Sequence, residues 1–458
     1  MKIIFRFFSL LLVFQTTVLL AQEANISNSD IASGVIYEAN IRQYSEEGTF
    51  NAFTKDLPVL RDLGVKVIWL MPVNPISTTK SKGPLGSYYA VSDYKKVNPE
   101  FGTADDFRAL VNKAHELGIY IILDWVPGHT GWDHVWIKEH PDFYLKNDKG
   151  EIIDPINHAT GKSWGWTDVA DLNYDNKKMQ KAMTNAMKYW IEEFDIDGYR
   201  VDQAYAVPQS FFDKTFKALR SLKPIFLLAE TDIEHPGGIE LVSKFDASYH
   251  SGNYFLNQIA QGKMTVTELE SHFKSVMEKH KDENILLNYT STHDVNSWQG
   301  TSAELYGDAY NMLTAFTYIF PGMPLIYSGQ EYELNKRLLF FEKDDFPKKN
   351  GETMTLLKQL GKLKNNNDAL TAGNGRAAYE SMNGFVKMNH GKENQIFAFK
   401  RSSQNNTIVF VANMSKNYAQ FTMNYNGTFT AFPRGKNKML SDSYEYVMKP
   451  WEYWILLK

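Results

Sequence analysis

The sequence predicts an α/β protein whose main part is a (β/α)8 TIM barrel, and two observations support this fold class. The first is an alternation of short apolar runs with amphipathic helices, from about residue 34 to residue 370. Near-continuous apolar strands indicate a parallel sheet that is buried on both faces and connected by helices. The second is the number of repeats, because about seven clear strand–helix units and one further expected strand complete a barrel. Periodicity alone would also fit a doubly wound sheet.

The elements follow in chain order. The strand candidates are Val35–Tyr37, Val67–Met71, Tyr120–Asp124, Gly198–Asp202, Ile225–Glu230, Ile285–Asn288 and Leu325–Tyr327, with the further strand expected near residues 245–248. In the helix predicted over Ala104–Leu117 the apolar residues recur on one face, and Gly118 marks its end. The other predicted helices are Asn51–Leu63, Asn176–Phe194, Pro208–Leu222, Val266–Lys281, Tyr306–Ile319 and Glu352–Lys364.

Two segments interrupt the alternation and predict additional domains. Residues 125–175 are rich in Gly, Asp, His and Trp and lack a good helix, which predicts a small domain inserted after the third strand. After residue 370, short strand-like runs alternate with Asn, Gly, Lys and Ser, which predicts a C-terminal antiparallel β-sandwich. Its expected strands are Gly384–Met388, Gln395–Phe399, Thr407–Val411, Gln420–Met423 and Tyr453–Leu457. The predicted domains are a barrel over 22–370, the insert over 125–175 and the sandwich over 371–458.

The first 21 residues have the pattern of a secretory signal peptide. Lys2 and Arg6 precede an apolar run from Phe7 to Leu20, and Ala21 is a small residue before a cleavage point. We therefore expect an exported protein, either periplasmic or extracellular. No other stretch approaches the ~18 continuous apolar residues of a membrane-spanning helix, so no membrane span is expected after removal of the signal.

The composition narrows the class of partner. The formal net charge of −4 gives no indication of a nucleic-acid partner. The chain has no Cys, so a large core rather than disulfides must stabilise it. The 10 Trp, 25 Tyr and 29 Phe offer faces that suit sugar rings, although most such residues are simply core.

Acidic residues stand at the ends of several predicted strands. Asp124, Asp202 and Glu230 end three of them, and Asp294 follows a fourth. One such acid can be the N-cap of the next helix, but four at the same end of different strands converge on one mouth. Converging carboxylates either bind a metal or act on a glycosidic bond. Arg200 favours the second use, because a guanidinium would repel a cation and would keep Asp202 ionised.

These residues resemble the signatures of the α-amylase family of retaining α-glucan-active glycoside hydrolases. DWVPGHT at 124–130, GYRVD at 198–202, the strand ending at Glu230, and STHD at 291–294 are similar to the four signatures of the family and occur in its order. The stretches MPVNPI at 71–76, YAVSDYKKVNPEFGT at 89–103, DLNYDN at 171–176 and PLIYSGQE at 324–331 are further matches. The resemblance covers the chain from about Gly34 to its end.

The resemblance implies a role for each residue of the mouth. Asp202 would be the nucleophile, Glu230 the general acid and then the base, and Asp294 the group that stabilises the distorted sugar. Arg200 would hold Asp202 in its charged form, and Asp124 would be a structural carboxylate near that guanidinium. His129 and His293 would hydrogen-bond the sugar, and Tyr89 would stack under its ring.

The sequence departs from the family pattern at two places. Gly128 replaces an Asn that ligates a structural calcium in the family, so calcium is doubtful, and the resemblance implies no cofactor for the chemistry. Tyr205 and Ala206 replace a Lys–His pair that lines the subsite of the leaving sugar. Because of this departure, the sequence does not decide whether attack is internal (endo) or terminal (exo), or whether the reaction is hydrolysis or transfer.

We therefore expect a secreted retaining α-glycoside hydrolase acting on α-1,4-glucans or maltooligosaccharides through a covalent glycosyl-Asp202 intermediate. An α-glucosidase, a cyclomaltodextrinase-like enzyme or a glucan transferase on the same scaffold is the alternative, and a non-catalytic glycan-binding protein is a remote one. Trp451 and Trp454 are candidates for a sugar platform in the C-terminal domain, whose usual role is packing against the barrel. The sequence leaves the oligomeric state open.

Overall fold

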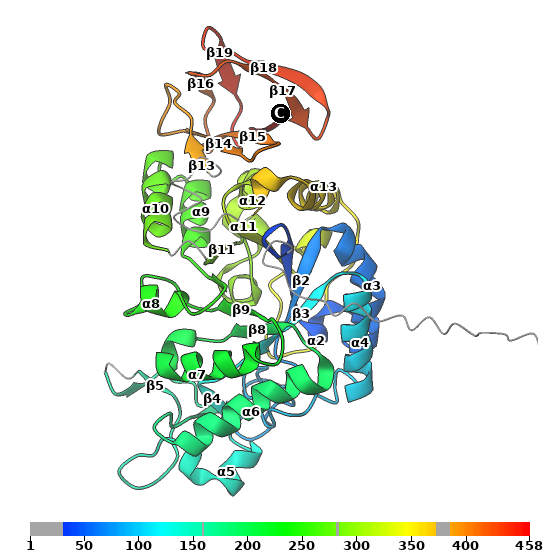
Figure 1. Cartoon of the computed structure of the whole chain (residues 1–458), viewed down its shortest axis with the longest axis vertical. Coiled ribbons are helices and arrows are strands. Elements are labelled where there is room, and N and C mark those ends of the chain that lie inside the picture. The colour runs from blue at the N-terminus through cyan, green and yellow to red at the C-terminus, as the bar shows by residue number, and fades with distance from the viewer. Residues whose placement is uncertain (1–30, 158–159, 281–283, 372–384) are drawn as a thin grey trace, which may run out of the picture.

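The chain forms a closed eight-stranded parallel barrel in the computed structural model, which describes residues 31–157, 160–280, 284–371 and 385–458 (Figure 1). The predicted signal peptide lies outside the described residues. The barrel order is β1-β12-β11-β10-β9-β8-β3-β2. Its strands are β1 Val35–Ala39, β2 Val65–Leu70, β3 Tyr120–Trp125, β8 Gly198–Val201, β9 Phe226–Ala229, β10 Ala247–Ser248, β11 Ile285–Asn288 and β12 Met323–Tyr327. The prediction of a TIM barrel is confirmed.

Helices surround the barrel and cover its outer face (Figure 1). They are α2 Ile41–Tyr44, α3 Phe50–Asp62, α4 Ala104–Glu116, α6 Lys177–Phe194, α7 Gln209–Arg220, α8 Gly238–Val242, α9 Gly252–Gln261, α10 Val266–Lys279, α11 Ser302–Tyr306, α12 Tyr310–Ile319 and α13 Glu352–Asn366. Local sequence fixes several starts: in α4 the Thr103 hydroxyl accepts from the Asp106 N–H, and the Asp106 carboxylate accepts from the Thr103 N–H.

The helix predicted over Tyr306–Ile319 begins later than expected, at Tyr310, and a separate short helix precedes it. α11 ends at Tyr306, and α12 begins only at Tyr310. Gly307 lies between them with a φ of +49°, a conformation that favours glycine and ends the first helix. Helix α9 was not predicted, because the strand before it has only two residues and the periodic pattern there is short.

The insert after β3 is a small antiparallel unit. β4 (His129–Gly131) pairs with β7 (Val169–Asp171), and β5 (Ile156–Asn157) pairs with β6 (Lys162–Ser163). The only α-helix in its described part is the five-residue α5 (Val135–Glu139). The register His129↔Asp171 brings the end of the insert back beside its start, close after β3 in the chain.

Antiparallel strands make up the C-terminal part, as predicted. A six-stranded sheet has the order β13-β14-β15-β20-β17-β18, and β16 pairs with β19. The strands are β13 Phe385–Lys387, β14 Ile396–Ser402, β15 Thr407–Asn413, β16 Ala419–Thr422, β17 Gly427–Phe432, β18 Lys436–Leu440, β19 Glu445–Met448 and β20 Tyr453–Leu457. The sheet packs on α12 through an aromatic cluster in which Phe316 contacts Phe397, Phe399 and Phe410.

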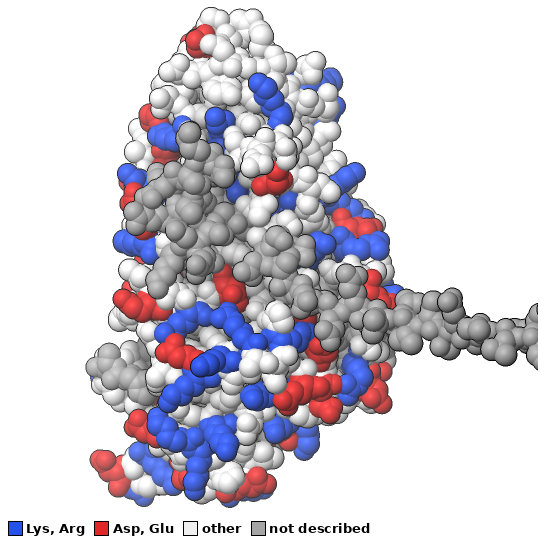
Figure 2. Space-filling view, viewed as in Figure 1, with Lys and Arg blue, Asp and Glu red and all other residues white. Residues whose placement is uncertain are grey.

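The surface carries charges of both signs. Acidic side chains are interspersed among the Lys and Arg side chains over α6 and α7, and the C-terminal part shows few charges on this face (Figure 2). In the part of the chain that the structure describes, the helices are too short or too polar to cross a membrane.

Candidate active site

A buried guanidinium connects three strand-end carboxylates. Arg200 Nη1 donates to Asp124 Oδ1 over 2.8 Å and to Asp202 Oδ1 over 2.9 Å. Its Nη2 forms an ion pair with Glu230 Oε2 at 3.0 Å. The Arg200 side chain is 0% exposed, so these carboxylates compensate a charge that water does not reach.

Strand register places these groups together. Asp124 on β3 is the register partner of Arg200 on β8. The ladder continues beyond the strands, because Asp202 N donates to the carbonyl of Trp125 and Glu230 N donates to the carbonyl of Val201. Each acid is therefore fixed by the strand beside it.

A glycine allows the close approach of β8 to β9. Gly198 has a φ of +148°, and a Cβ there would lie 1.8 Å from the backbone oxygen of Phe226. This approach explains why the GYRVD stretch begins with glycine, since any side chain would push the two strands apart.

Aromatic rings surround the guanidinium on its other side. The Trp69 ring centroid lies 4.8 Å from Arg200 Cζ and that of Tyr249 lies 5.7 Å away, so both rings make cation–π contacts. Trp69 Nε1 also donates to Asp124 Oδ2 over 3.1 Å. Arg200 and Trp69 thus both donate to Asp124, whose predicted role is structural.

A chain of hydrogen bonds fixes the protonation of His293. The Tyr89 hydroxyl donates to Asp124 Oδ2 over 2.9 Å and lies 2.9 Å from His293 Nε2. Because the hydroxyl has one hydrogen, Nε2–H is the donor in the second bond. His293 Nδ1 is hydrogen-bonded to Glu38, so both ring nitrogens carry hydrogen. Burial opposes this charge, but Asp294 and Glu38 outweigh it and raise the pKa of His293 to about 9.

His129 is the neutral counterpart of His293. It lies on β4 at the wall of the same cavity, and burial lowers its pKa to about 4. Asp294 stands at the rim, with its side chain 49% exposed and Oδ2 3.4 Å from His293 Nε2. The cavity thus offers a cationic imidazole, a neutral imidazole and an accessible carboxylate.

The Asp202 and Glu230 carboxyl groups lie close enough to affect each other's ionisation. Burial raises the pKa of Asp202, and the nearby Glu230 carboxyl raises it further, while Arg200 lowers it. Arg200 therefore acts in the direction that favours the charged form of Asp202, against desolvation and a second carboxyl. The pair therefore retains a proton at pH values where an isolated aspartate has lost it.

The carboxylates of Asp202, Glu230 and Asp294 line a cavity of about 440 Å³, which is large enough for sugar units. The structure brings the eight predicted site residues together at this place. Tyr89, His129, Asp202, Glu230, His293 and Asp294 line the cavity, while Asp124 and Arg200 lie beneath it, hydrogen-bonded to Tyr89 and Asp202 respectively. The role of each residue stays a prediction.

Some residues of the site were missed from the sequence. Glu38 on β1 is 0% exposed and holds His293, and its signal was a carboxylate inside the buried run VIYEA. Gln203 N donates to Glu230 Oε2 over 2.7 Å from a left-handed backbone (φ +41°), which nothing in the sequence indicated. Phe340 stacks on Tyr89 with a centroid separation of 6.2 Å and comes from a loop without periodicity.

Gly128 does not supply the side-chain ligand that the corresponding Asn provides to calcium in the resembling family. A Cβ at Gly128 would meet nothing within 4 Å, so the position has room for a side chain but supplies no side-chain oxygen. Within residues 31–157, 160–280, 284–371 and 385–458, no group of three or more Asp, Glu or His side chains could hold a metal ion.

Comparisons with known proteins agree with this geometry. A family model described as the α-amylase catalytic domain matches residues 24–219. α-Amylase 3 of Dictyoglomus thermophilum is 27% identical over 65% of this chain and 64% of its own length. The cyclomaltodextrinase of Thermoanaerobacter pseudethanolicus is 24% identical over 82% of this chain and 66% of its own. The chain thus spans about two thirds of the length of these curated relatives.

Solved structures show the same fold over nearly the whole chain. A noncanonic maltogenic α-amylase from Thermotoga neapolitana superposes with a TM-score of 0.82 at 25% identity, covering 93% of this chain and 99% of the other. An α-amylase from Lactobacillus plantarum gives a TM-score of 0.80 at 25% identity over 94% of this chain and 100% of the other. Together with the carboxylate cluster around Arg200, these similarities place the chain in the α-amylase family of glycoside hydrolases.

Proposed function

We propose that the protein hydrolyses α-1,4-glucans or maltooligosaccharides with retention of configuration at the anomeric carbon. The observation that carries the proposal is the contact of Arg200 with Asp124, Asp202 and Glu230 beneath a sugar-sized cavity. A nucleophilic carboxylate and a carboxylic acid on opposite sides of one glycosidic bond are what double displacement requires.

In the first step Asp202 attacks the anomeric carbon of the bound sugar. The C1–O bond to the leaving sugar breaks, and the proton on Glu230 moves to the departing oxygen. Arg200 stays hydrogen-bonded to Asp202 and disperses its charge until the ester forms. The products of this step are a glycosyl–Asp202 ester and a free sugar end.

In the second step water enters the place of the departed sugar. Glu230, now ionised, takes a proton from the water as the water oxygen attacks C1, and the bond between C1 and Asp202 breaks. Glu230 ends the cycle protonated and Asp202 ends it ionised, so protons and charges balance. If another sugar hydroxyl enters in place of water, the same chemistry transfers the glycosyl group.

The remaining site residues hold the reacting sugar. Cationic His293 directs its Nε2–H toward Tyr89 at the cavity wall, where a sugar hydroxyl can accept from it. Asp294 at the rim accepts from hydroxyls, and neutral His129 offers one N–H donor. Tyr89 places its ring face beside the cavity, parallel to His293 within 23°. Such contacts strengthen as the ring flattens toward the oxocarbenium-like state.

Product analysis over time tests this proposal. We expect starch and maltoheptaose to yield shorter maltooligosaccharides, with early long fragments if attack is internal. Glucose alone would indicate an α-glucosidase, faster turnover of cyclodextrin than of starch a cyclomaltodextrinase-like enzyme, and products longer than the starting sugar a transferase. The cyclomaltodextrinase relative makes cyclodextrin and pullulan necessary substrates in this series.

A matched pair of variants separates a catalyst from a glycan-binding protein. Glu230→Gln keeps the shape of the side chain but has no proton to give, so turnover should fall by about 10² to 10⁴ while maltoheptaose still binds. Glu234→Gln, an exposed residue four positions later, is the control. A wild-type protein that binds α-glucans but cleaves none would refute the proposal.

We also propose that the protein is exported, on the basis of the apolar run in residues 7–20. The expected mature N-terminus follows residue 21. Mass spectrometry of the protein recovered from the producing cells and their medium tests this, and an intact Met1 in the mature protein would contradict it.

A further inference from the structure

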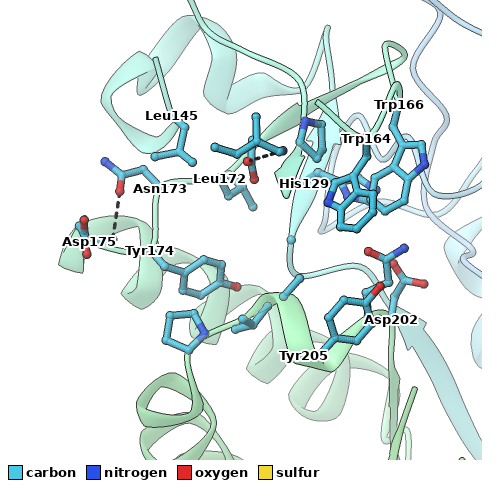
Figure 3. A pocket seen from close by; sticks show the side chains of 18 residues that line it. His129, Leu145, Trp164, Trp166, Leu172, Asn173, Tyr174, Asp175, Asp202 and Tyr205 are labelled. Carbon is cyan, nitrogen blue, oxygen red and sulfur yellow. Dashed lines mark hydrogen bonds between the residues drawn. The ribbon is translucent and has the colours of Figure 1, made fainter. Parts of the chain in front are cut away.

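The cavity of the reacting groups continues into a neighbouring cavity of about 510 Å³, and Trp166 and Asp202 are among the residues that line both. The two cavities form one cleft, with Trp164 and Trp166 on one side and Tyr205 on the other (Figure 3). A third cavity lies apart from this cleft, at the junction of the barrel and the C-terminal part. Among the described residues, none lines both the cleft and the third cavity.

The third cavity has a volume of about 940 Å³, more than twice the 440 Å³ of the cavity of the reacting groups. One side is formed by α9, α11 and α12 of the barrel, and the other by the segments around Lys416 and Trp451. Lys416 Nζ donates to the carbonyl of Gln261 over 3.3 Å and so connects the two sides. Cavities of this volume accommodate small ligands.

Trp451 lines this cavity from a strained turn. Glu452 N donates to the carbonyl of Lys449 over 3.2 Å, and Lys449 N donates to Glu452 Oε2 over 2.9 Å, which closes a β-turn over residues 449–452. Pro450 is the second residue of the turn, and Trp451, the third, has a φ of +59°. These are features of a type II turn, whose third position favours glycine. The chain therefore carries an indole at a position where the backbone is strained for any bulky residue.

The Trp451 indole has a donor to offer to a ligand. The side chain is partly buried against the main hydrophobic core, and its Nε1–H has no acceptor in the part of the chain that the structure describes. Trp454, two positions later, differs because its Nε1 donates to Glu452 and Lys438 lies over its ring. Of these two tryptophans, only Trp451 thus keeps a free N–H beside a cavity.

Polar side chains without partners surround the indole. Asp308 and Asn311 are exposed and stand one turn apart at the start of α12, and Lys449 faces the cavity from the C-terminal part. Within residues 31–157, 160–280, 284–371 and 385–458, these three side chains form no hydrogen bond or ion pair. Carboxylate and amide oxygens accept from hydroxyls, and amide and ammonium groups donate to them. The cavity therefore suits a ligand with apolar ring faces and a rim of hydroxyls.

The charges that line the cavity have both signs. Glu304, Asp308 and Glu452 are acidic, whereas Lys416 and Lys449 are basic. A polyanion such as a nucleic acid is bound by a surface of one sign, so this lining favours a neutral ligand. A chain of sugar units is neutral, has apolar ring faces, and carries hydroxyls that both donate and accept hydrogen bonds.

We propose that this cavity binds a segment of α-glucan against Trp451, as a second sugar site separate from the cleft. The inference rests on the proposed function, because the ligand is the polymer that the cleft cleaves. A polymer held at Trp451 keeps its other segments at a high effective concentration near the cleft. The site therefore raises the rate on polymeric starch and leaves unchanged the rate on a substrate that lies wholly within the cleft.

Two substrates separate this site from the chemistry. Insoluble starch can occupy both sites at once, whereas para-nitrophenyl α-maltotrioside is too short to do so. We expect Trp451→Gly to lower the rate on starch granules about tenfold and to change kcat/KM for the maltotrioside by less than about twofold. In a Glu230→Gln background, in which turnover is blocked, the same substitution should weaken adsorption to starch by a similar factor.

Further variants separate the ring from the backbone. Trp451→Gly removes the ring but suits the positive φ, so the turn is kept. Trp451→Phe keeps a flat ring on the strained backbone and should retain adsorption within about threefold. Asn311→Ala, at an exposed position of α12, should weaken adsorption about threefold without altering the turn. Tyr444→Ala is the matched control, since its ring is 48% exposed in the C-terminal part and does not line the cavity.

The outcomes for the second site and for the proposed hydrolysis are distinct. Unchanged adsorption in Trp451→Gly, or an equal loss of activity on both substrates, would overturn the second site and leave the hydrolysis intact. A wild-type protein that adsorbs to starch through Trp451 but cleaves neither substrate would refute the hydrolysis and still support the site. Urea unfolding midpoints of Trp451→Gly and Trp451→Phe within error of each other would show that the difference in adsorption is not a folding defect. If Trp451→Gly does not fold, unchanged adsorption in Asn311→Ala would overturn the site.

Discussion

Glu38 and His293 form a buried hydrogen bond although 255 residues separate them in the chain. The bond joins β1 to the loop after β11 and fixes the orientation of the His293 ring at the wall of the cavity. Glu38 Oε1 also accepts from the backbone N–H of His293 over 3.3 Å, so it orients both the ring and the main chain. Its contribution is positional and electrostatic, because Glu38 contacts His293 and does not itself line the cavity.

The first prediction concerns the charge of His293. Glu38→Gln keeps an acceptor oxygen but removes one of the two anions that raise the imidazole pKa to about 9, so this pKa should fall. Because the folded-state pKa lies above the unfolded value of about 6.5, the pair stabilises the fold below that pH and the contribution is lost as pH rises through about 9. NMR titration of the imidazole, assigned with His293→Gln, measures the change. Glu192→Gln, at an exposed position of α6, should leave the titration unchanged; an identical titration in Glu38→Gln would contradict the assignment.

The second prediction concerns Arg200. Arg200→Met removes the cation shared by three carboxylates and should cost about 3–5 kcal/mol of unfolding free energy. Because Arg200 lowers the pKa of Asp202, its loss raises that pKa further, and the acidic limb of kcat/KM should move to higher pH. Arg220→Met breaks a surface ion pair with Asp246 in which the arginine is 43% exposed, and should cost under about 1 kcal/mol. Equal destabilisation of the two variants in urea would argue against a central role for the buried guanidinium.

The third prediction concerns acid stability. His250 is buried and held neutral, because its Nδ1 accepts from Gly252 N over 2.9 Å and its Nε2 lies 3.1 Å from Asn288 Oδ1. Burial lowers its pKa to about 3, so between pH 6.5 and about 3 the unfolded chain binds a proton that the folded chain does not. The free energy of unfolding should therefore decrease as the pH is lowered below 6.5. At pH 4 this residue alone should account for a loss of about 3 kcal/mol. The urea unfolding midpoint should change less steeply with pH in His250→Asn than in the wild type. In His140→Asn, which replaces an exposed histidine, the slope should equal that of the wild type. Equal slopes for His250→Asn and the wild type would disprove this role of His250.

The fourth prediction concerns the C-terminal part. Lys438 Nζ lies 3.3 Å from the centroid of the Trp454 ring, and Trp454 Nε1 donates to Glu452 over 3.0 Å. Because its partners already occupy the indole, Trp454 is poorly placed to serve as a sugar platform. In a Glu230→Gln background, Trp454→Ala should lower the unfolding midpoint without weakening adsorption to insoluble starch. Loss of adsorption with an unchanged midpoint would restore the platform interpretation.

The sequence was most informative where one strand supplied adjacent groups. Arg200 and Asp202 stand two residues apart at the end of one strand. Asp124 and Glu230 stand at the ends of the two strands on either side of it, so the convergence of the four groups followed from the barrel alone. Glu38 could not be joined to His293 in this way, because their contact depends on where the loop after β11 turns. Strands β17 to β19 were missed because many of their side chains are exposed and give no continuous apolar run.

The insert was predicted as a segment but not as a wall of the cleft. Trp164 and Trp166 were ordinary aromatic residues in a loop until the pairing of β4 with β7 placed that loop over the nucleophile. Tyr205 was noted only as a departure from the family pattern. Its stacking on His235 comes from two loops that follow different strands, and no local pattern encodes that contact.

The closure of the barrel through β1 and β12 has a consequence for biosynthesis. Ile36 pairs with Leu325, so the first strand made has a free edge until nearly the last part of the barrel leaves the ribosome. Glu38 meanwhile has neither His293 nor a closed interior around it. The cavity therefore closes only once β12 is present, and a product terminated before β12 would contain most of the site residues without forming the site.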